Sequence, residues 1–138
     1  MLDSEITEDD RALAESAREA MKHAWTPVTG YRVGAAVRTL EGAIITGCNV
    51  EHPVPHEGCC AEKVALYAAV AAGYRQFTAV AVASAGHPPA TPCGSCRQTL
   101  DHWGIRRVIV THETGGERLV DLATLLPESF KWMPGDPV

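Results

Sequence analysis

Helical and strand patterns alternate along this chain, and their order limits the folds open to it. Apolar residues recur at helical spacing in some segments, and they alternate or run continuously, as strands do, in others. The first half of the chain is expected to form a helix over residues 8–24, a strand hairpin over 31–38 and 43–48, and a helix from Cys59 or Cys60 to Gly73. The second half is expected to form a strand over 77–84, a helix over 92–103, a strand over 107–111 and a short helix over 119–126. The helix over 92–103 would begin with Pro92 at its first position. A hairpin followed by strands and helices in alternation predicts an α/β protein, a three-layer α/β/α sandwich with a mixed sheet of about five strands.

Length and composition fit one globular domain. The chain has 138 residues, within the roughly 100–200 residues of a single domain. We find no internal repeat, low-complexity tract or change of composition, so residues 1–138 are expected to form a single domain. Apolar residues make up 46% of the chain, with only two Phe, three Tyr and three Trp, so the core must be packed mainly by Ala, Val, Leu and Ile.

Charge and hydropathy argue against two classes of partner. The formal net charge is −5, and an acidic surface repels a phosphate backbone, so no polynucleotide partner is expected. The longest apolar stretch covers residues 64–72, far short of the roughly 20 residues that span a bilayer, so no membrane partner is expected. The N-terminal residues are acidic where a secretory signal would be basic and then apolar, which predicts a cytoplasmic protein with reduced thiols.

Five cysteines in a reducing compartment suggest a metal site or catalysis rather than disulfides. Cys93 and Cys96 form a C-x-x-C pair at the start of a predicted helix, where residues three apart share a face and the helix dipole favours thiolates. A thioredoxin-like redox pair has the same spacing. Cys60 supplies a third thiol at the start of another predicted helix. We therefore predict that Cys60, Cys93 and Cys96 bind one zinc ion.

Three thiolates leave one position of a zinc tetrahedron open, as in catalytic sites. A closed structural site would need a fourth ligand, which could come from Cys59, Cys48 or His102, but no second C-x-x-C pair is present. Glu62 stands two residues after Cys60, one turn into an otherwise apolar helix. A carboxylate in that position can act as a general acid and base, so Glu62 is the predicted catalytic residue.

A zinc ion with three thiolates carries a net negative charge, which weakens its activation of water. Nearby positive charge is therefore expected. The two helix dipoles contribute, and Lys63 and Arg97, each directly after a ligand segment, are the candidate charge-compensating cations. A solvated surface position is the alternative for each side chain.

These segments resemble the zinc nucleobase deaminases, in which a His-x-Glu or Cys-x-Glu element precedes Pro-Cys-x-x-Cys. Here the two elements are Cys60-Ala-Glu62 and Pro92-Cys-Gly-Ser-Cys96. Further segments similar to the small homotetrameric cytidine deaminases are Val33-Gly-Ala-Ala36, Thr46-Gly-Cys-Asn-Val-Glu51, Cys96-Arg-Gln98 and Leu125-Leu-Pro127. The resemblance implies zinc-dependent hydrolytic deamination of cytidine or deoxycytidine to the uracil nucleoside and ammonia, as in pyrimidine salvage. In that reaction Glu62 would carry protons from water to N3 of the base and to the departing amine.

The same resemblance assigns contacts to the substrate. Asn49 and Glu51 match residues that hydrogen-bond the sugar hydroxyls, although loop residues that form a turn are the alternative. Tyr31 falls where the family usually has a phenylalanine lining the base pocket, and Ala61 is expected beside it. Phe130 lies near the C-terminal aromatic residue that family members insert into a neighbouring subunit's site, which implies a homotetramer.

Departures from the family pattern leave the substrate open. Residues 52–59 differ from the usual loop that borders the substrate, and Lys63 replaces the usual arginine, whose fork gives tighter geometric control. The tail over residues 130–133 is similar to the blasticidin S deaminases, so a modified cytosine nucleoside is the alternative substrate, although Glu51 favours the cytidine branch. A non-enzymatic zinc or redox module would not need Glu62. A polynucleotide-editing deaminase would need a basic groove with stacking aromatic residues.

Overall fold

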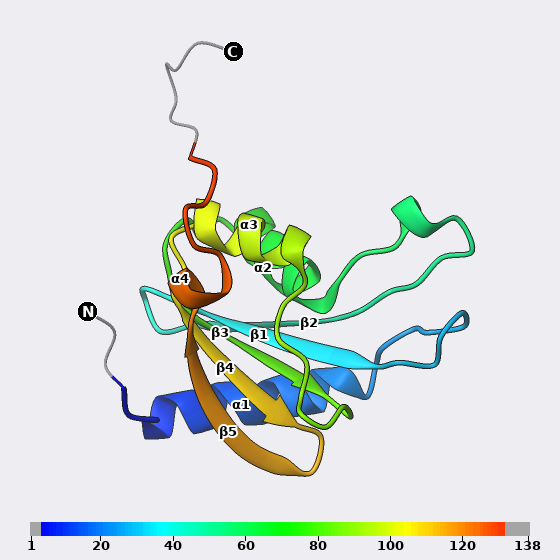
Figure 1. Ribbon diagram of the computed structural model, residues 1–138, viewed down its shortest axis with the longest axis horizontal. Coiled ribbons are helices and arrows are strands. Elements are labelled where there is room, and N and C mark those ends of the chain that lie inside the picture. The colour runs from blue at the N-terminus through cyan, green and yellow to red at the C-terminus, as the bar shows by residue number, and fades with distance from the viewer. Residues whose placement is uncertain (1–3, 132–138) are drawn as a thin grey trace.

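The computed structural model describes residues 4–131, and all structural statements below concern that range. Its elements, in chain order, are α1 (Glu8–Met21), β1 (Val33–Thr39), β2 (Ile44–Cys48), the short 3-10 helix η1 (Pro55–Glu57), α2 (Ala61–Ala71), β3 (Phe77–Ser84), α3 (Gly94–His102), β4 (Arg107–His112), β5 (Gly115–Asp121) and α4 (Leu122–Leu125). Figure 1 shows α1 on one face of the sheet and the other α-helices on the opposite face. The predicted three-layer α/β/α arrangement is confirmed.

The five strands form one mixed sheet in the order β2-β1-β3-β4-β5. Strands β3 and β4 are parallel, with Val80 opposite Val108, and the other neighbours are antiparallel. The crossover between β3 and β4 carries α3, as a parallel connection requires. Because α2 and α3 lie on the same face, their N-termini can meet at one end of the sheet.

Several predicted boundaries are wrong. The first helix ends at Met21 rather than residue 24, and the helix expected from Pro92 begins at Gly94, with Cys93 as its N-cap. Residues 119–121, expected to be helical, belong to β5, and only Leu122–Leu125 form the last helix. Pairing with β4 explains the difference, because Leu119 lies opposite Ile109 in the antiparallel ladder. The Asp121 side chain then accepts the N–H of Ala123 and starts α4.

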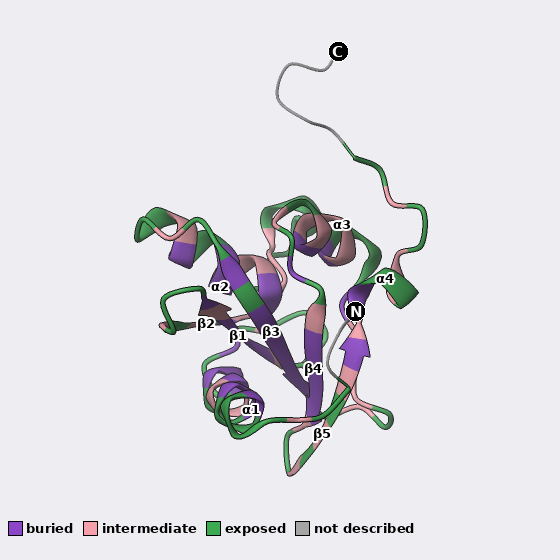
Figure 2. Ribbon diagram, turned by 90° about the vertical axis from the view of Figure 1, so that its left-hand side faces the viewer, coloured by how far each residue is buried: buried purple, intermediate pink, exposed green. Residues whose placement is uncertain are grey.

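Small residues let the helices pack closely on the sheet. The buried core is largely Ala, Val, Leu and Ile, as the composition predicts, and the central strand β3 is buried along most of its length (Figure 2). At Gly34 in β1, an added Cβ would lie 2.0 Å from the carbonyl oxygen of Ala17 in α1. At Gly47 in β2, it would lie 2.4 Å from the backbone nitrogen of Ala65 in α2. These two glycines bring a helix against each face of the β1–β2 hairpin.

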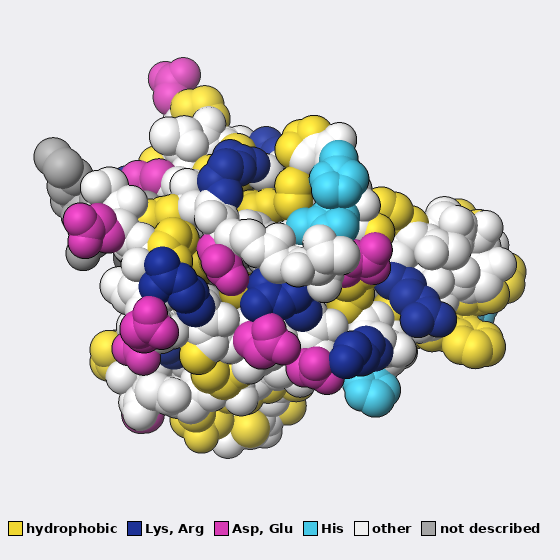
Figure 3. Space-filling model, turned by 90° about the horizontal axis from the view of Figure 1, so that it is seen from below, with side chains coloured by type: hydrophobic (Ala, Val, Ile, Leu, Met, Phe, Trp, Pro, Cys, Tyr) yellow, Lys and Arg dark blue, Asp and Glu magenta, His cyan; other side chains and the backbone are white. Residues whose placement is uncertain are grey.

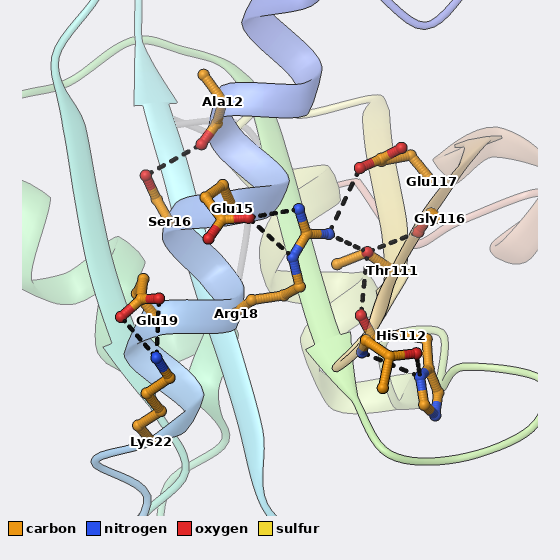
Figure 4. A network of polar contacts seen from close by, with 11 residues as sticks. Ala12, Glu15, Ser16, Arg18, Glu19, Lys22, Thr111, His112, Gly116 and Glu117 are labelled. Carbon is orange, nitrogen blue, oxygen red and sulfur yellow. Dashed lines mark hydrogen bonds and ion pairs between the residues drawn. The ribbon is translucent and has the colours of Figure 1, made fainter.

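Polar contacts fix α1 along the sheet. The Arg18 guanidinium donates to Glu15 on its own helix, to the Thr111 hydroxyl at 2.6 Å and to Glu117 at 3.4 Å, so it joins α1 to β4 and β5 (Figure 4). On the face seen in Figure 3, Lys and Arg side chains lie among Asp and Glu side chains rather than gathering into one basic patch. Among the described residues, no helix is long and apolar enough to cross a membrane.

Asp10 is a fully buried carboxylate in the first turn of α1. It accepts the Thr7 N–H at 2.9 Å in a capping box and the Arg107 Nε–H at 3.1 Å, and Arg38 lies 3.4 Å away. Burial alone would raise the pKa of Asp10, but the hydrogen bonds from Arg107 and Thr7 outweigh it and lower that pKa to about 2. The ionised form therefore stabilises the fold.

This depressed pKa predicts how stability depends on pH. Because the folded pKa lies below the unfolded value, the contribution of Asp10 is complete above about pH 4 and is lost as the pH falls toward about 2. We expect a loss of about 2 kcal/mol in the free energy of unfolding over that interval. Urea unfolding at a series of pH values should show this slope. The slope should be reduced in Asp10→Asn. It should be kept in Asp9→Asn, because the native Asp9 carboxylate is exposed on the same turn. An unchanged slope in Asp10→Asn would contradict the assignment.

Candidate active site

Three thiols meet where the N-termini of α2 and α3 converge. Cys60 is the N-cap of α2, Cys93 is the N-cap of α3, and Cys96 lies in the first turn of α3. The three sulfur atoms lie within 4.8 Å of one another, and the Sγ atoms of Cys60 and Cys93 are 3.9 Å apart. Neither N-cap cysteine hydrogen-bonds its own helix through its side chain, so both sulfurs are available to a ligand.

The geometry of this cluster fits a tetrahedral zinc ion. Zn–S bonds of about 2.3 Å at tetrahedral angles place sulfurs roughly 3.8 Å apart, close to the separation of Cys60 and Cys93. Within residues 4–131, the cluster of candidate ligand atoms does not extend to Cys59, Cys48 or His102. Three sulfur donors on a partly exposed cluster leave one coordination position for another ligand, which is the arrangement of a catalytic site.

The thiols also influence one another's protonation. A hydrogen bond from Cys96 lowers the pKa of Cys60 to about 6 against the opposing effect of burial, and the bond from Cys93 and the charge of Lys63 act in the same direction. The hydrogen bond to Cys60, together with burial, raises the pKa of Cys96. One thiolate is thus already favoured in the protein, as metal binding by cysteine requires.

Glu62 projects beside the thiols into a cavity of about 200 Å³. Only 5% of the residue is exposed, and burial, reinforced by the negative charge of Cys60, raises the pKa of its carboxyl to about 6. The cavity is lined by Tyr31, Val33, Asn49, Cys60, Ala61, Glu62, Val82, Ala90, Thr91 and Cys93. A buried carboxylate whose pKa lies near neutrality can both accept and return a proton.

The two predicted cations have different partners. The Lys63 ammonium donates to the hydroxyl of Ser95, between the two cysteines of α3, and its charge helps to lower the pKa of Cys60 and Glu62. Arg97 instead donates to the carbonyl oxygens of Pro92 and Leu125 and to the Thr91 hydroxyl. Its guanidinium therefore holds the loop that leads into Cys93.

The predicted substrate residues fall into three groups. Tyr31, Asn49 and Ala61 line the cavity beside Glu62. Glu51 lines an adjoining hollow of about 380 Å³ that shares Asn49 and Cys60 with the cavity. Phe130 is apart from both, with 70% of the residue exposed and its carbonyl oxygen held by the Gln98 side chain at 3.0 Å.

Sequence reasoning missed two hydroxyl groups in this region. Ser95 bonds Lys63, and Thr29 bonds Glu51, although each pair is far apart in the chain. Ser95 stands between two candidate zinc ligands, Cys93 and Cys96, and this position could have indicated that its hydroxyl lies at the site. Thr29 lies in an irregular segment, and no spacing pattern connects it to Glu51.

Comparison with known proteins agrees with this geometry. Residues 7–112 match the family profile described as the cytidine and deoxycytidylate deaminase zinc-binding region. A cytidine deaminase of Sporosarcina psychrophila is 36% identical over 123 residues, covering 88% of this chain and 90% of that protein. A cytidine deaminase of Mycobacterium tuberculosis is 33% identical over 122 residues, covering 88% of this chain and 90% of that protein.

Solved structures give the same result. The crystal structure of cytidine deaminase from Burkholderia pseudomallei superimposes with a TM-score of 0.83 at 40% identity, covering 91% of this chain and all of that one. The structure of the Mycobacterium tuberculosis enzyme gives a TM-score of 0.75 at 33% identity, covering 88% of this chain and 96% of that one.

The fold and the thiol cluster define a zinc-binding α/β protein with an acidic side chain beside the metal site. The chain belongs to the cytidine and deoxycytidylate deaminase family. It carries the zinc-binding region of that family, and the cluster of Cys60, Cys93 and Cys96 fits zinc ligation.

Proposed function

We propose that this protein hydrolyses cytidine or deoxycytidine to uridine or deoxyuridine and ammonia. The observation that carries the proposal is the buried carboxylate of Glu62, which shares a cavity of about 200 Å³ with Cys60 and Cys93. The similarity to cytidine deaminases supports cytosine as the base. A non-enzymatic zinc or redox module would not require a buried acid at this point, and the formal net charge of −5 gives no support to a polynucleotide substrate.

The chain's own residues supply the proton transfers of this reaction. Zinc held by Cys60, Cys93 and Cys96 would supply Lewis acidity that activates water. Glu62 accepts the proton of the attacking water and delivers it to N3 while the water oxygen bonds to C4 of the base. Glu62 then takes the second proton from the new C4 hydroxyl and delivers it to the exocyclic amine, so that the C4–N bond breaks, ammonia leaves and a C4 carbonyl forms. The raised pKa of Glu62 suits this repeated exchange.

Other residues orient the nucleoside. Tyr31, Ala61 and Val82 provide the apolar walls of the cavity, where the flat base would be held. Asn49 lies at the boundary with the adjoining hollow and Glu51 lies inside it, so the sugar would point there. Lys63 supports the ligand segments by its charge, and Arg97 supports them by fixing the loop before Cys93.

The setting of the reaction is also part of the proposal. We infer a cytoplasmic homotetramer, acting in pyrimidine salvage, in which Phe130 of one subunit approaches the site of another. The 70% exposure of Phe130 supports this arrangement. Trp132, part of the same predicted tail, lies outside the described residues. Light scattering on the native protein should give the mass of four chains, and a fully active monomer would exclude the arrangement.

A substrate screen tests the function. Ammonia release by the zinc-loaded protein should be measured with cytosine, adenine and guanine nucleosides and with free cytosine. We expect cytidine or deoxycytidine to be turned over and the purine nucleosides to be inert, because the chain is similar to cytidine deaminases. Equal rates with cytidine and free cytosine would contradict a nucleoside substrate.

A modified cytosine nucleoside is the second candidate, and one observation favours it. The adjoining hollow of about 380 Å³ is walled by His52, Pro53 and Pro55, in the loop that departs from the family pattern. It is larger than the cavity and borders it at Asn49 and Cys60, which line both. A nucleoside with a bulky substituent on its sugar would extend into this hollow. Preference for blasticidin S over cytidine in the same screen would establish this alternative.

A further inference from the structure

The segment between α1 and β1 carries Tyr31 to the cavity, yet little packing holds it there. Residues 27–32 are exposed, and the segment contains a turn closed by the Gly30 N–H on the Thr26 carbonyl oxygen at 3.0 Å. Gly30 adopts φ +72°, a conformation that favours glycine. An exposed segment without apolar anchors opens readily unless hydrogen bonds fix it.

Glu51 and Thr29 provide such bonds on one side of Tyr31. The Glu51 Oε1 atom accepts the N–H groups of Val28 and Thr29, both at 3.0 Å, and its Oε2 atom accepts the Thr29 hydroxyl. The same hydroxyl oxygen accepts the Tyr31 N–H at 3.0 Å. Because a hydroxyl has a single donor, its bond to Glu51 orients its lone pairs and so presents one of them to Tyr31.

Asn49 provides the bonds on the other side. Its Nδ2 group donates to the Tyr31 carbonyl oxygen at 2.8 Å, and its Oδ1 atom accepts the Val33 N–H at 2.9 Å. The segment that follows β2 thus holds the Tyr31 carbonyl oxygen directly through Asn49, and it holds the Tyr31 N–H indirectly, through the Thr29 hydroxyl that Glu51 binds. The Tyr31 hydroxyl reaches the loop after β3, where a Cβ added to Gly86 would lie 2.9 Å from it. Tyr31 therefore lines the cavity and also reaches the loop after β3.

We propose that Thr29 is a positioning residue that sets where Tyr31 lies over the cavity, and that Glu51 acts on the substrate partly through Thr29. A carboxylate can accept about four hydrogen bonds. The Glu51 carboxylate already accepts three within the protein, which leaves one for a sugar hydroxyl. Glu51 then has two tasks, the direct contact with the sugar and the placement of the base-pocket wall. The proposal for catalysis rests on the proposed function, whereas the placement of Tyr31 does not.

Amide hydrogen exchange tests the placement without any substrate. In Thr29→Val a methyl group replaces the hydroxyl at nearly the same volume, whereas Thr29→Ser keeps the hydroxyl. NMR exchange rates at the Tyr31 amide should rise about tenfold in Thr29→Val, since one hydrogen bond is lost, and stay near the native rate in Thr29→Ser. Equal rates in the native protein and in Thr29→Val would overturn the proposal.

Kinetics test whether the placement matters for the substrate. We expect kcat/KM for cytidine to fall about tenfold in Thr29→Val, because small displacements of positioning groups reduce rate, and to recover in Thr29→Ser. In a Tyr31→Ala background, Thr29→Val should add little further loss, because its effect passes through Tyr31. The same loss in both backgrounds, or no loss in either, would overturn the proposal. If the native protein deaminates no cytosine nucleoside, the proposed function fails while the exchange result still decides the placement.

Discussion

Replacing Glu62 with glutamine is expected to lower kcat for cytidine by at least about 10²–10⁴-fold while zinc stays bound. Glutamine keeps the size of the side chain and its place in the cavity, but it cannot accept a proton from water or return one to the base. The three zinc ligands all remain in this variant, because Glu62 is not one of them. Steady-state kinetics and metal analysis by mass spectrometry on the same preparation measure both quantities.

A matched control separates proton transfer from loss of charge. Glu41→Gln removes a carboxylate from the exposed turn between β1 and β2, far along the hairpin from the cavity, and should leave kcat unchanged. Near-native turnover in Glu62→Gln would exclude Glu62 as the group that moves protons. Loss of zinc in Glu62→Gln would instead show that the carboxylate supports the metal site.

Replacing Cys60 with alanine is expected to reduce zinc from about one ion per chain to a small fraction of that, and to abolish turnover. Two sulfur donors hold zinc far less firmly than three, and the water-activating group is then lost. Cys59→Ala is the matched control, because Cys59 is the neighbouring half-buried thiol and is not part of the cluster. It should keep zinc and activity. Zinc lost in Cys59→Ala but kept in Cys60→Ala would contradict the ligand assignment.

Local spacing was enough to predict the centre of the site. Cys93 and Cys96 are three residues apart at a helix start, and Cys60 stands two residues before Glu62, so each pair shares one helix turn. The prediction that these two pairs meet depended on both helices lying on one face of the sheet. The structure brings them together with the Cys60 and Cys93 sulfurs 3.9 Å apart.

Long-range partners could not be predicted in the same way. The carboxylate of Glu51 bonds Val28 and Thr29, residues 23 and 22 positions earlier, and nothing in either segment indicates the other. The last strand, β5, was also missed. It begins with two glycines and is only partly buried, so its extended form depends on pairing with β4 rather than on its own pattern.

The central claim is that this chain adds water to a cytosine nucleoside and releases ammonia. The direct measurement is mass spectrometry of the product formed from cytidine by the zinc-loaded protein in water enriched in ¹⁸O. We expect uridine carrying a single ¹⁸O atom at C4, together with one equivalent of ammonia, because the oxygen that replaces the amine comes from water. Uridine without the label, or no turnover of cytidine, deoxycytidine or a modified cytosine nucleoside by fully zinc-loaded protein, would contradict the account.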